Sequence, residues 1–149
     1  MRLTSGFDAS ASALTAQRLR MDVISSNIAN AETTRASYAN GRYEPYKRKM
    51  VVLEPGAQSF ADTLNGQMNG SGNAPGVKAT KIIEDSTPSK LVYNPTHPDA
   101  DENGYVKMPN VDVLKEMVDM ISASRSYEAN VTALNASKGM FVKALEIGK

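Results

Sequence analysis

A row of apolar residues recurs every seventh position near the carboxyl end of this sequence and limits the possible folds more than any other feature. The row consists of Val113, Met120, Tyr127, Leu134 and Phe141, and a companion row four residues further on contains Met117, Ser124, Val131, Lys138 and Leu145. Both rows fall on one face of an α-helix, and a strict seven-residue repeat favours a left-handed supercoil with a partner helix. The pattern predicts a helix over residues 110–147, with Asn110 as its N-cap and Gly148 as its terminator.

A shorter repeat near the amino end predicts the partner helix, over residues 5–30. Its apolar stripe contains Phe7, Leu14, Met21, Ile24 and Ile28. Ser5 is the expected N-cap and Asn30 the expected stop, since Asn tolerates positive φ. Alanines and serines fill residues 9–13, which leaves room for another backbone to approach closely. We expect this stripe to pack on the seven-residue row of the carboxyl helix.

The sequence therefore divides into three regions. We expect a helix and a turn over residues 1–34, a middle region over 35–109, and a long helix over 110–149, with the two helices forming one helical core. Short strands are predicted at 46–53, 81–83 and 91–93, joined into a small sheet, and the glycines of 65–76 predict a flexible loop. The predicted fold class is mainly α: long terminal helices that form a coiled coil, with a small, irregular, β-rich middle.

Composition excludes several kinds of site. The chain has no cysteine and a formal net charge of +1, so thiol chemistry is excluded and no long-range field attracts nucleic acid. The amino end lacks a basic region followed by an apolar run, and no segment is apolar enough to span a membrane. We expect no cofactor, no metal, no nucleic acid and no small-molecule substrate. A second apolar stripe on the carboxyl helix, at Leu114, Val118 and Ile121, instead predicts contacts with other protein chains.

Three motifs have both a functional and an ordinary interpretation. Residues 99–104 resemble the start of a calcium-binding loop, but Asn110 stands where a bidentate Glu is required, which favours a polar turn. His97 is the only histidine, and a hydrolytic site would combine it with Asp99 or Asp101. The basic cluster at 47–49 is a weak nucleic-acid footprint, and a solvated strand end or a contact to an acidic neighbour explains it better.

The segment SSNIANAETTR, at residues 25–35, resembles the signature of the flagellar rod, hook and hook-associated family. The segments at 11–22, 93–111 and 116–130 resemble the short proximal-rod members of that family. The resemblance implies a non-enzymatic subunit that is exported by the flagellar type III apparatus. It also implies that the subunit polymerises with copies of itself and other rod proteins in the basal-body rod, outside the cytoplasmic membrane. It assigns the signature turn to Asn27, Asn30, Thr33 and Thr34. An adaptor that presents its helices to a single partner is the alternative.

Overall fold

The computed structural model describes residues 5–39, 42–56, 64, 68 and 76–147. Its elements follow one another along the chain as α1 (Ser5–Ala29), β1 (Ser37–Ala39), β2 (Arg42–Glu44), β3 (Lys49–Pro55), β4 (Val77–Glu84), β5 (Lys90–Tyr93), β6 (Tyr105–Met108) and α3 (Val113–Ile147). Most of the loop expected at 65–76, and the expected terminator Gly148, lie outside the described residues.

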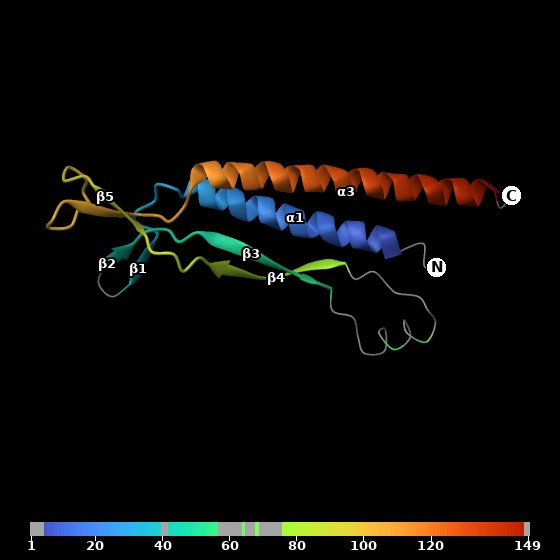
Figure 1. Cartoon of the computed structure of the whole chain (residues 1–149), viewed down its shortest axis with the longest axis horizontal. Helices are drawn as coiled ribbons and strands as arrows, with labels where there is room; N and C mark the ends of the chain where they lie inside the picture. Colours follow the sequence, from blue (N-terminus) through green and yellow to red (C-terminus); the bar gives the residue numbers. More distant parts are fainter. Residues whose placement is uncertain (1–4, 40–41, 57–63, 65–67, 69–75, 148–149) are drawn as a thin grey trace.

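Two long helices, one near each end of the chain, dominate the structure. They lie side by side and run in opposite directions, so both termini are found at the same end of the molecule (Figure 1). This confirms the two predicted helices and the short strands between them. None of the helices in the described ranges is long and apolar enough to cross a membrane.

The start of α3 differs from its prediction. Asp112, rather than Asn110, caps the helix, because its Oδ1 accepts hydrogen bonds from the backbone N–H groups of Leu114 (3.1 Å) and Lys115 (3.5 Å). Asn110 lies outside the helix, and its side chain binds the middle region instead. Both residue types suit an N-cap, so local sequence did not distinguish them.

The middle region forms three separate two-stranded antiparallel ladders, β1–β2, β3–β4 and β5–β6. The expectation of one small sheet is therefore wrong, although the predicted strands at 46–53, 81–83 and 91–93 correspond to β3, β4 and β5. In the longest ladder Lys49 pairs with Glu84 and Pro55 with Val77, with an irregularity between Val52 and Leu53. The β1–β2 and β5–β6 ladders lie at the end of the molecule away from the termini (Figure 1).

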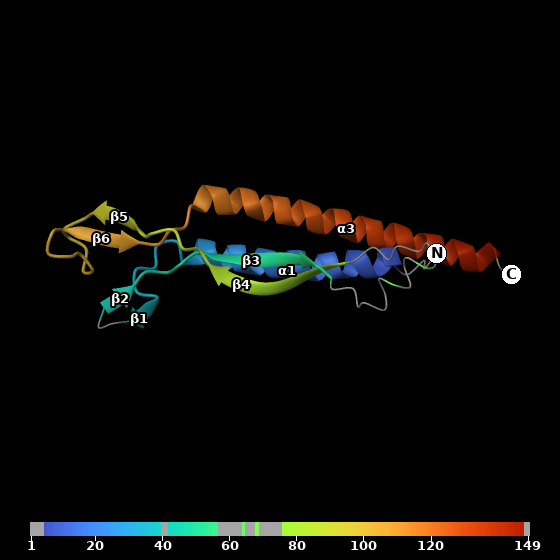
Figure 2. The same ribbon diagram turned by 60° about the horizontal axis from the view of Figure 1, so that its bottom comes forward.

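Helix α1 packs against α3 and also against the β3–β4 ladder (Figures 1 and 2). Its buried residues Ala16, Val23 and Ile24 form much of the small core. The beginning of β4 crosses α1 closely, and the Val77 N–H donates to Ser12 Oγ over 3.1 Å. The small residues of α1 therefore allow another part of the backbone to approach closely, as predicted.

Candidate functional site: a buried polar junction and an exposed helix face

Asn27, near the end of α1, is almost completely buried, and its side-chain amide uses every hydrogen-bonding position it has. Its Nδ2 donates to the carbonyl oxygen of Lys49 (2.9 Å) and to Glu116 Oε2 (3.0 Å). Its Oδ1 accepts from the hydroxyl of Tyr46 (2.9 Å) and from the N–H of Lys49 (3.0 Å). One residue thus connects α1, the start of β3 and the first turn of α3.

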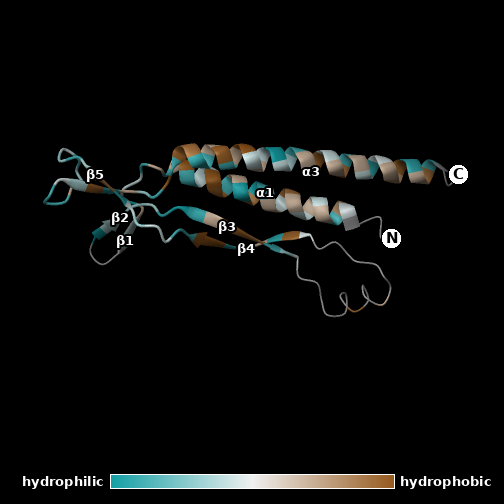
Figure 3. Ribbon diagram, in the orientation of Figure 1, coloured by the Kyte–Doolittle hydropathy of each residue, from teal (hydrophilic) through white to brown (hydrophobic). Residues whose placement is uncertain are grey.

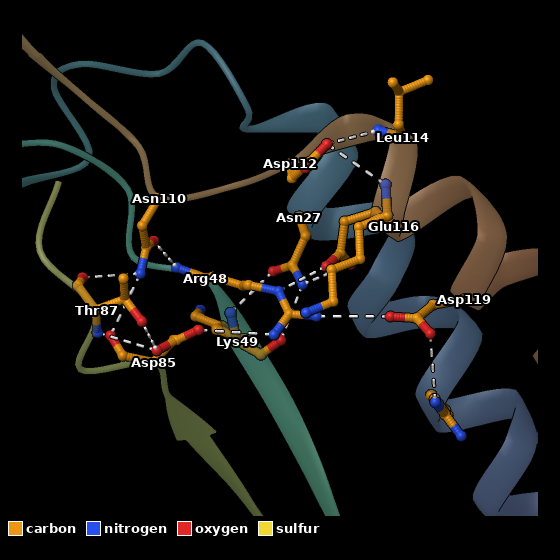
Figure 4. A network of polar contacts seen from close by, with 12 residues as sticks. Asn27, Arg48, Lys49, Asp85, Thr87, Asn110, Asp112, Leu114, Glu116 and Asp119 are labelled. Atoms are coloured by element: carbon orange, nitrogen blue, oxygen red, sulfur yellow. Dashed lines mark hydrogen bonds and ion pairs between the residues drawn. The ribbon is translucent and has the colours of Figure 1, made fainter. Parts of the chain in front are cut away.

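Glu116 and Arg48 complete this arrangement with a buried ion pair. The Glu116 side chain has no exposed surface, and its Oε1 accepts a 2.6 Å hydrogen bond from Arg48 Nε. The Arg48 guanidinium also lies 3.7 Å from carboxylate oxygens of both Asp85 and Asp119 (Figure 4). A buried charge without partners costs several kcal/mol, so this cluster requires all of its members.

Asn110 ties the connection after β4 to the same place. Its Oδ1 accepts from the N–H of Arg48 (2.8 Å), and its Nδ2 donates to the carbonyl oxygen of Thr87 (3.1 Å). Hydrogen bonds from Thr87 lower the pKa of Asp85, and the Arg48 charge lowers it further. We call the five residues Asn27, Tyr46, Arg48, Asn110 and Glu116 the polar junction. Its polar groups bind one another, so its chemistry is that of a structural connection.

Of the residues assigned to the signature turn, Asn27 lies within α1, and Asn30, Thr33 and Thr34 follow directly after the helix. The Thr33 hydroxyl donates to Asn30 Oδ1 (3.2 Å), and the Thr33 carbonyl accepts from the N–H of Tyr46 (3.0 Å). Thr34 and Arg35 both bind Asp99: the Thr34 hydroxyl donates to Oδ2 (2.8 Å) and Arg35 Nε to Oδ1 (2.6 Å). Arg35 first, and Thr34 second, lower the pKa of Asp99. The turn therefore fixes the path of the chain from α1 into the middle region.

The motifs with functional interpretations are engaged in structural contacts. The Asp99 carboxylate binds Thr34 and Arg35, and His97 Nδ1 accepts from the Asp99 N–H over 3.1 Å. Within the described ranges, no group of three or more His, Asp or Glu side chains could hold a metal ion. In the basic cluster, Arg48 is paired with acidic neighbours and Lys47 lies 3.1 Å from Glu44, which confirms the acidic-neighbour interpretation for both.

The predicted helix-packing residues occupy different environments in the single chain. On α1, Ile24 is buried, Leu14, Met21 and Ile28 are half-buried, and Phe7 is exposed. On α3, the half-buried residues are Met120, Tyr127, Val131, Leu134 and Phe141, and the exposed ones are Val113, Met117 and Leu145. Glu116 and Ala123, four residues before Met120 and Tyr127, are buried, whereas Ser124 and Val131, four residues after them, are only half-buried. The seam between the helices is therefore more polar, and built from smaller residues, than its apolar pattern indicated.

An apolar stripe covers the opposite side of α3 near its start. The spacing of its members, i, i+3, i+4 and i+7, places them on one face, away from Glu116 and Ala123. This outer stripe consists of Leu114, Met117, Val118 and Ile121, of which Leu114 is 76% and Val118 66% exposed. Hydrophobic colouring is concentrated on this part of α3 (Figure 3). The single chain leaves the outer stripe without a cover.

Sequence reasoning missed most of the polar junction. It assigned Asn27 to a turn and did not connect it with Tyr46, Arg48 or Glu116. One signal was available: Asn27 and Glu116 interrupt otherwise apolar helix faces at core-facing positions, and a buried polar group needs a partner. The identity of those partners depends on how the helices approach the middle region.

Comparison with known proteins places both ends of the chain in one family. A model described as Flagella basal body rod protein matches residues 7–36, and one described as Flagellar basal body rod FlgEFG protein C-terminal matches residues 102–147. The chain is 65% identical over 141 residues to the flagellar basal-body rod protein FlgC of Bacillus subtilis (strain 168), with 94% of each chain covered. It is 46% identical over 149 residues to FlgC of Salmonella typhimurium, with 100% of each covered. With FlgC of Borreliella burgdorferi it shares 45% over 158 residues, covering 99% of this chain and 98% of that one.

Proposed function

This chain belongs to the flagellar basal-body rod proteins and is a structural subunit of that rod, and we propose that it polymerises there through its two terminal helices. It is not an enzyme, and its place is the rod of the basal body. Its proposed partners are copies of itself and other rod proteins. The proposed route to the rod is the flagellar type III export apparatus, as the family resemblance implies.

The outer stripe of α3 is the observation that carries this proposal. Four large apolar side chains lie exposed on one face, within two turns of the helix. Burying each of them fully would contribute about 1.5–3 kcal/mol. A monomer rarely leaves such a cluster in water, whereas a subunit of a polymer covers it with its neighbour.

The helix pair contributes the other part of the assembly surface. We propose that α1 and α3 supercoil as a coiled coil in the rod, with Leu14, Met21 and Ile28 facing Met120, Tyr127, Leu134 and Phe141. The remaining predicted packing residues, which lie exposed in the single chain, then contact neighbouring subunits; these are Phe7, Val113, Met117 and Leu145. A shaft that transmits torque requires close packing of this kind.

The polar junction and the signature turn have a supporting role in this proposal. They hold the middle region at one fixed angle to the helix pair, because Asn27 binds both β3 and α3, Asn110 binds the backbone of Arg48 and Thr87, and Thr34 binds Asp99. A polymer repeats this angle in every subunit. If the junction were flexible, the angle would differ between subunits, and their contact surfaces would no longer lie in equivalent positions. The proposal assigns Asn27, Asn30, Thr33 and Thr34 to this task.

Val118→Asp tests the proposal, because it places a charge in the outer stripe and leaves the seam with α1 unchanged. We expect the variant chain to keep its helical circular dichroism while its cells lose motility and the subunit is missing from isolated basal bodies. Ser122→Asp is the matched control, since Ser122 is exposed on α3 beside the stripe. Motile cells with Val118→Asp subunits in their basal bodies would contradict the proposal.

A further inference from the structure

We propose that the free edge of β4 in one subunit pairs with β5 of the next, which joins two separate ladders into one four-stranded antiparallel sheet across the subunit boundary. This inference rests on the proposed polymerisation and names a contact that the helices do not provide. The order of strands in the joined sheet would be β3 and β4 from one subunit, then β5 and β6 from its neighbour.

Both strands have an unused edge. Each belongs to a ladder of only two strands, and among the described residues neither β4 nor β5 forms backbone hydrogen bonds with a third strand. A two-stranded ladder is marginally stable in water, and an exposed apolar edge invites another strand to join. The relevant side chains are exposed: Ile83 is 37% and Leu91 63% accessible, and Ile82, Val92 and Tyr93 are exposed as well. Hydrophobic residues mark the end of β4 in Figure 3.

The two edges are complementary in an antiparallel register. Placing Glu84 opposite Lys90 brings Ile83 opposite Leu91. The same register brings Ile82 opposite Val92, and Lys81 opposite the ring of Tyr93. The result is one ion pair, two apolar pairs and one cation–π contact, each of a kind that stabilises neighbouring strands. Neither Glu84 nor Lys90 has an ion-pair partner elsewhere in the part of the chain that the structure describes.

The same chain does not form this pair with itself, although only five residues separate β4 from β5. The segment between β4 and β5 is hydrogen-bonded to the polar junction. The Asp85 N–H donates to the carbonyl oxygen of Arg48 (2.8 Å), and the carbonyl oxygen of Thr87 accepts from Asn110 Nδ2 (3.1 Å). These contacts direct the chain away from β4 and toward the far end of the molecule (Figure 1). The polar junction thus keeps both edges open for a neighbour.

Symmetry favours β4–β5 pairing over β4–β4 pairing. Two identical edges that pair antiparallel form a closed dimer, which leaves no edge for a third subunit. Two different edges form a head-to-tail contact, so each added subunit presents a new β4 and a new β5. Only the second kind of contact continues along a polymer, as a rod requires.

Cysteine cross-linking tests the pairing directly, because the chain contains no cysteine. Cells without their own subunit would express two full-length chains together, Ile83→Cys and Leu91→Cys, so that any disulfide between the two is intermolecular. Residues directly opposite in an antiparallel pair have Cα atoms about 4.5–5.5 Å apart, within the range of a disulfide. After mild oxidation of isolated basal bodies, we expect a disulfide-linked dimer on a non-reducing gel.

The matched control combines Ile83→Cys with Lys107→Cys. Lys107 lies on β6 opposite Leu91, so in the joined sheet it is one strand further from β4, beyond the reach of a disulfide. We expect no dimer from this combination. Basal bodies that contain the Ile83→Cys and Leu91→Cys chains without a dimer, or with no more dimer than the control, would overturn the pairing and leave the proposed polymerisation intact.

A charge exchange provides an independent test if the cysteine variants do not assemble. Glu84→Lys and Lys90→Glu should each reduce motility, since each places like charges opposite one another in the joined sheet. The double variant should restore it. Within one chain Glu84 is opposite Lys49, and Lys90→Glu does not relieve that repulsion, so a rescue reports the contact between subunits. No rescue would overturn the pairing, whereas absence of the unmodified chain from basal bodies would overturn the proposed function itself.

Discussion

At the scale of single residues, Glu116 shows how strongly this small core depends on a polar contact. Its carboxylate is fully buried and is bound by Arg48 and Asn27. Glu116→Ala removes the shortest ion-pair contact of the guanidinium and one of the two acceptors of the Asn27 amide, and we expect a loss of about 3–5 kcal/mol in the free energy of unfolding. Urea denaturation of the purified chain, followed by circular dichroism, measures the loss.

The control for this substitution lies on the same helix. Glu128 forms an exposed pair with Arg125 at 3.1 Å, and exposed pairs contribute about 0–1 kcal/mol. Glu128→Ala should therefore hardly change the urea midpoint. Equal losses from the two substitutions would mean that the Arg48–Glu116 pair does not stabilise the junction.

The pKa of Asp99 leads to a prediction about pH. Its folded-state pKa is lowered from the ordinary 3.8 by Arg35 and Thr34. Its contribution to stability is therefore fully present above pH 3.8 and is lost as the pH falls through the lower, folded-state value. We expect the unfolding midpoint of Asp99→Asn to lie below that of the natural chain at pH 6, and the difference to shrink below pH 4. A difference that stays constant down to pH 2.5 would show that the carboxylate charge is not involved.

At the scale of helices and strands, apolar spacing predicted both long helices to within three residues of their observed ends. An apolar residue at every seventh position over many turns is typical of an α-helix and of no other secondary structure. The predicted seam did not include Glu116, because it is a charged residue that no apolar pattern would select, although it is fully buried. Its burial depends on Arg48, which is 68 residues away in the sequence.

The short strands were predictable only where apolar residues gather. β1 and β2 have three residues each and contain mostly exposed side chains, so their sequence gives no alternation to detect. The signature turn could be located from the family resemblance, but its attachment to Asp99 could not. That contact joins residues 65 positions apart in sequence and requires the β5–β6 ladder to be in place.

The contact between β4 and α1 leads to a prediction with opposite outcomes at two glycines. A Cβ added at Gly76 would contact the side chain of Ser12 and would lie only 3.1 Å from the Cβ of Ser12. Gly76→Ala should therefore lower the thermal midpoint of the purified chain. Gly139 lies inside α3 with nothing within 4 Å, so Gly139→Ala should stabilise the helix by about 0.5–1 kcal/mol. Stabilisation by both would mean that the start of β4 does not press on α1.

At the scale of the whole molecule, the two helices have unequal lengths, and the difference determines which end is left uncovered. Asn27 contacts Glu116, and Met21 contacts Ser124, which sets the antiparallel alignment of α1 and α3. Continuing this alignment places Ser5, the first residue of α1, opposite about residue 139 of α3. The last turns of α3 extend past that point, and there Leu145 is 75% exposed although it belongs to the companion row predicted to face α1.

Leu145→Asp tests whether these last turns serve the polymer rather than the single chain. Since Leu145 has few contacts to lose, we expect the purified variant to melt at the temperature of the natural chain. In cells, a charge on a surface that the neighbouring subunit covers should remove the subunit from basal bodies and abolish motility. Ala136→Asp adds the same charge to an exposed position of α3 that lies outside the seam rows, and should leave motility intact. A lowered melting temperature for Leu145→Asp, with motility retained, would assign this end of α3 to the fold of the monomer, because only a contact within the chain would then have been lost.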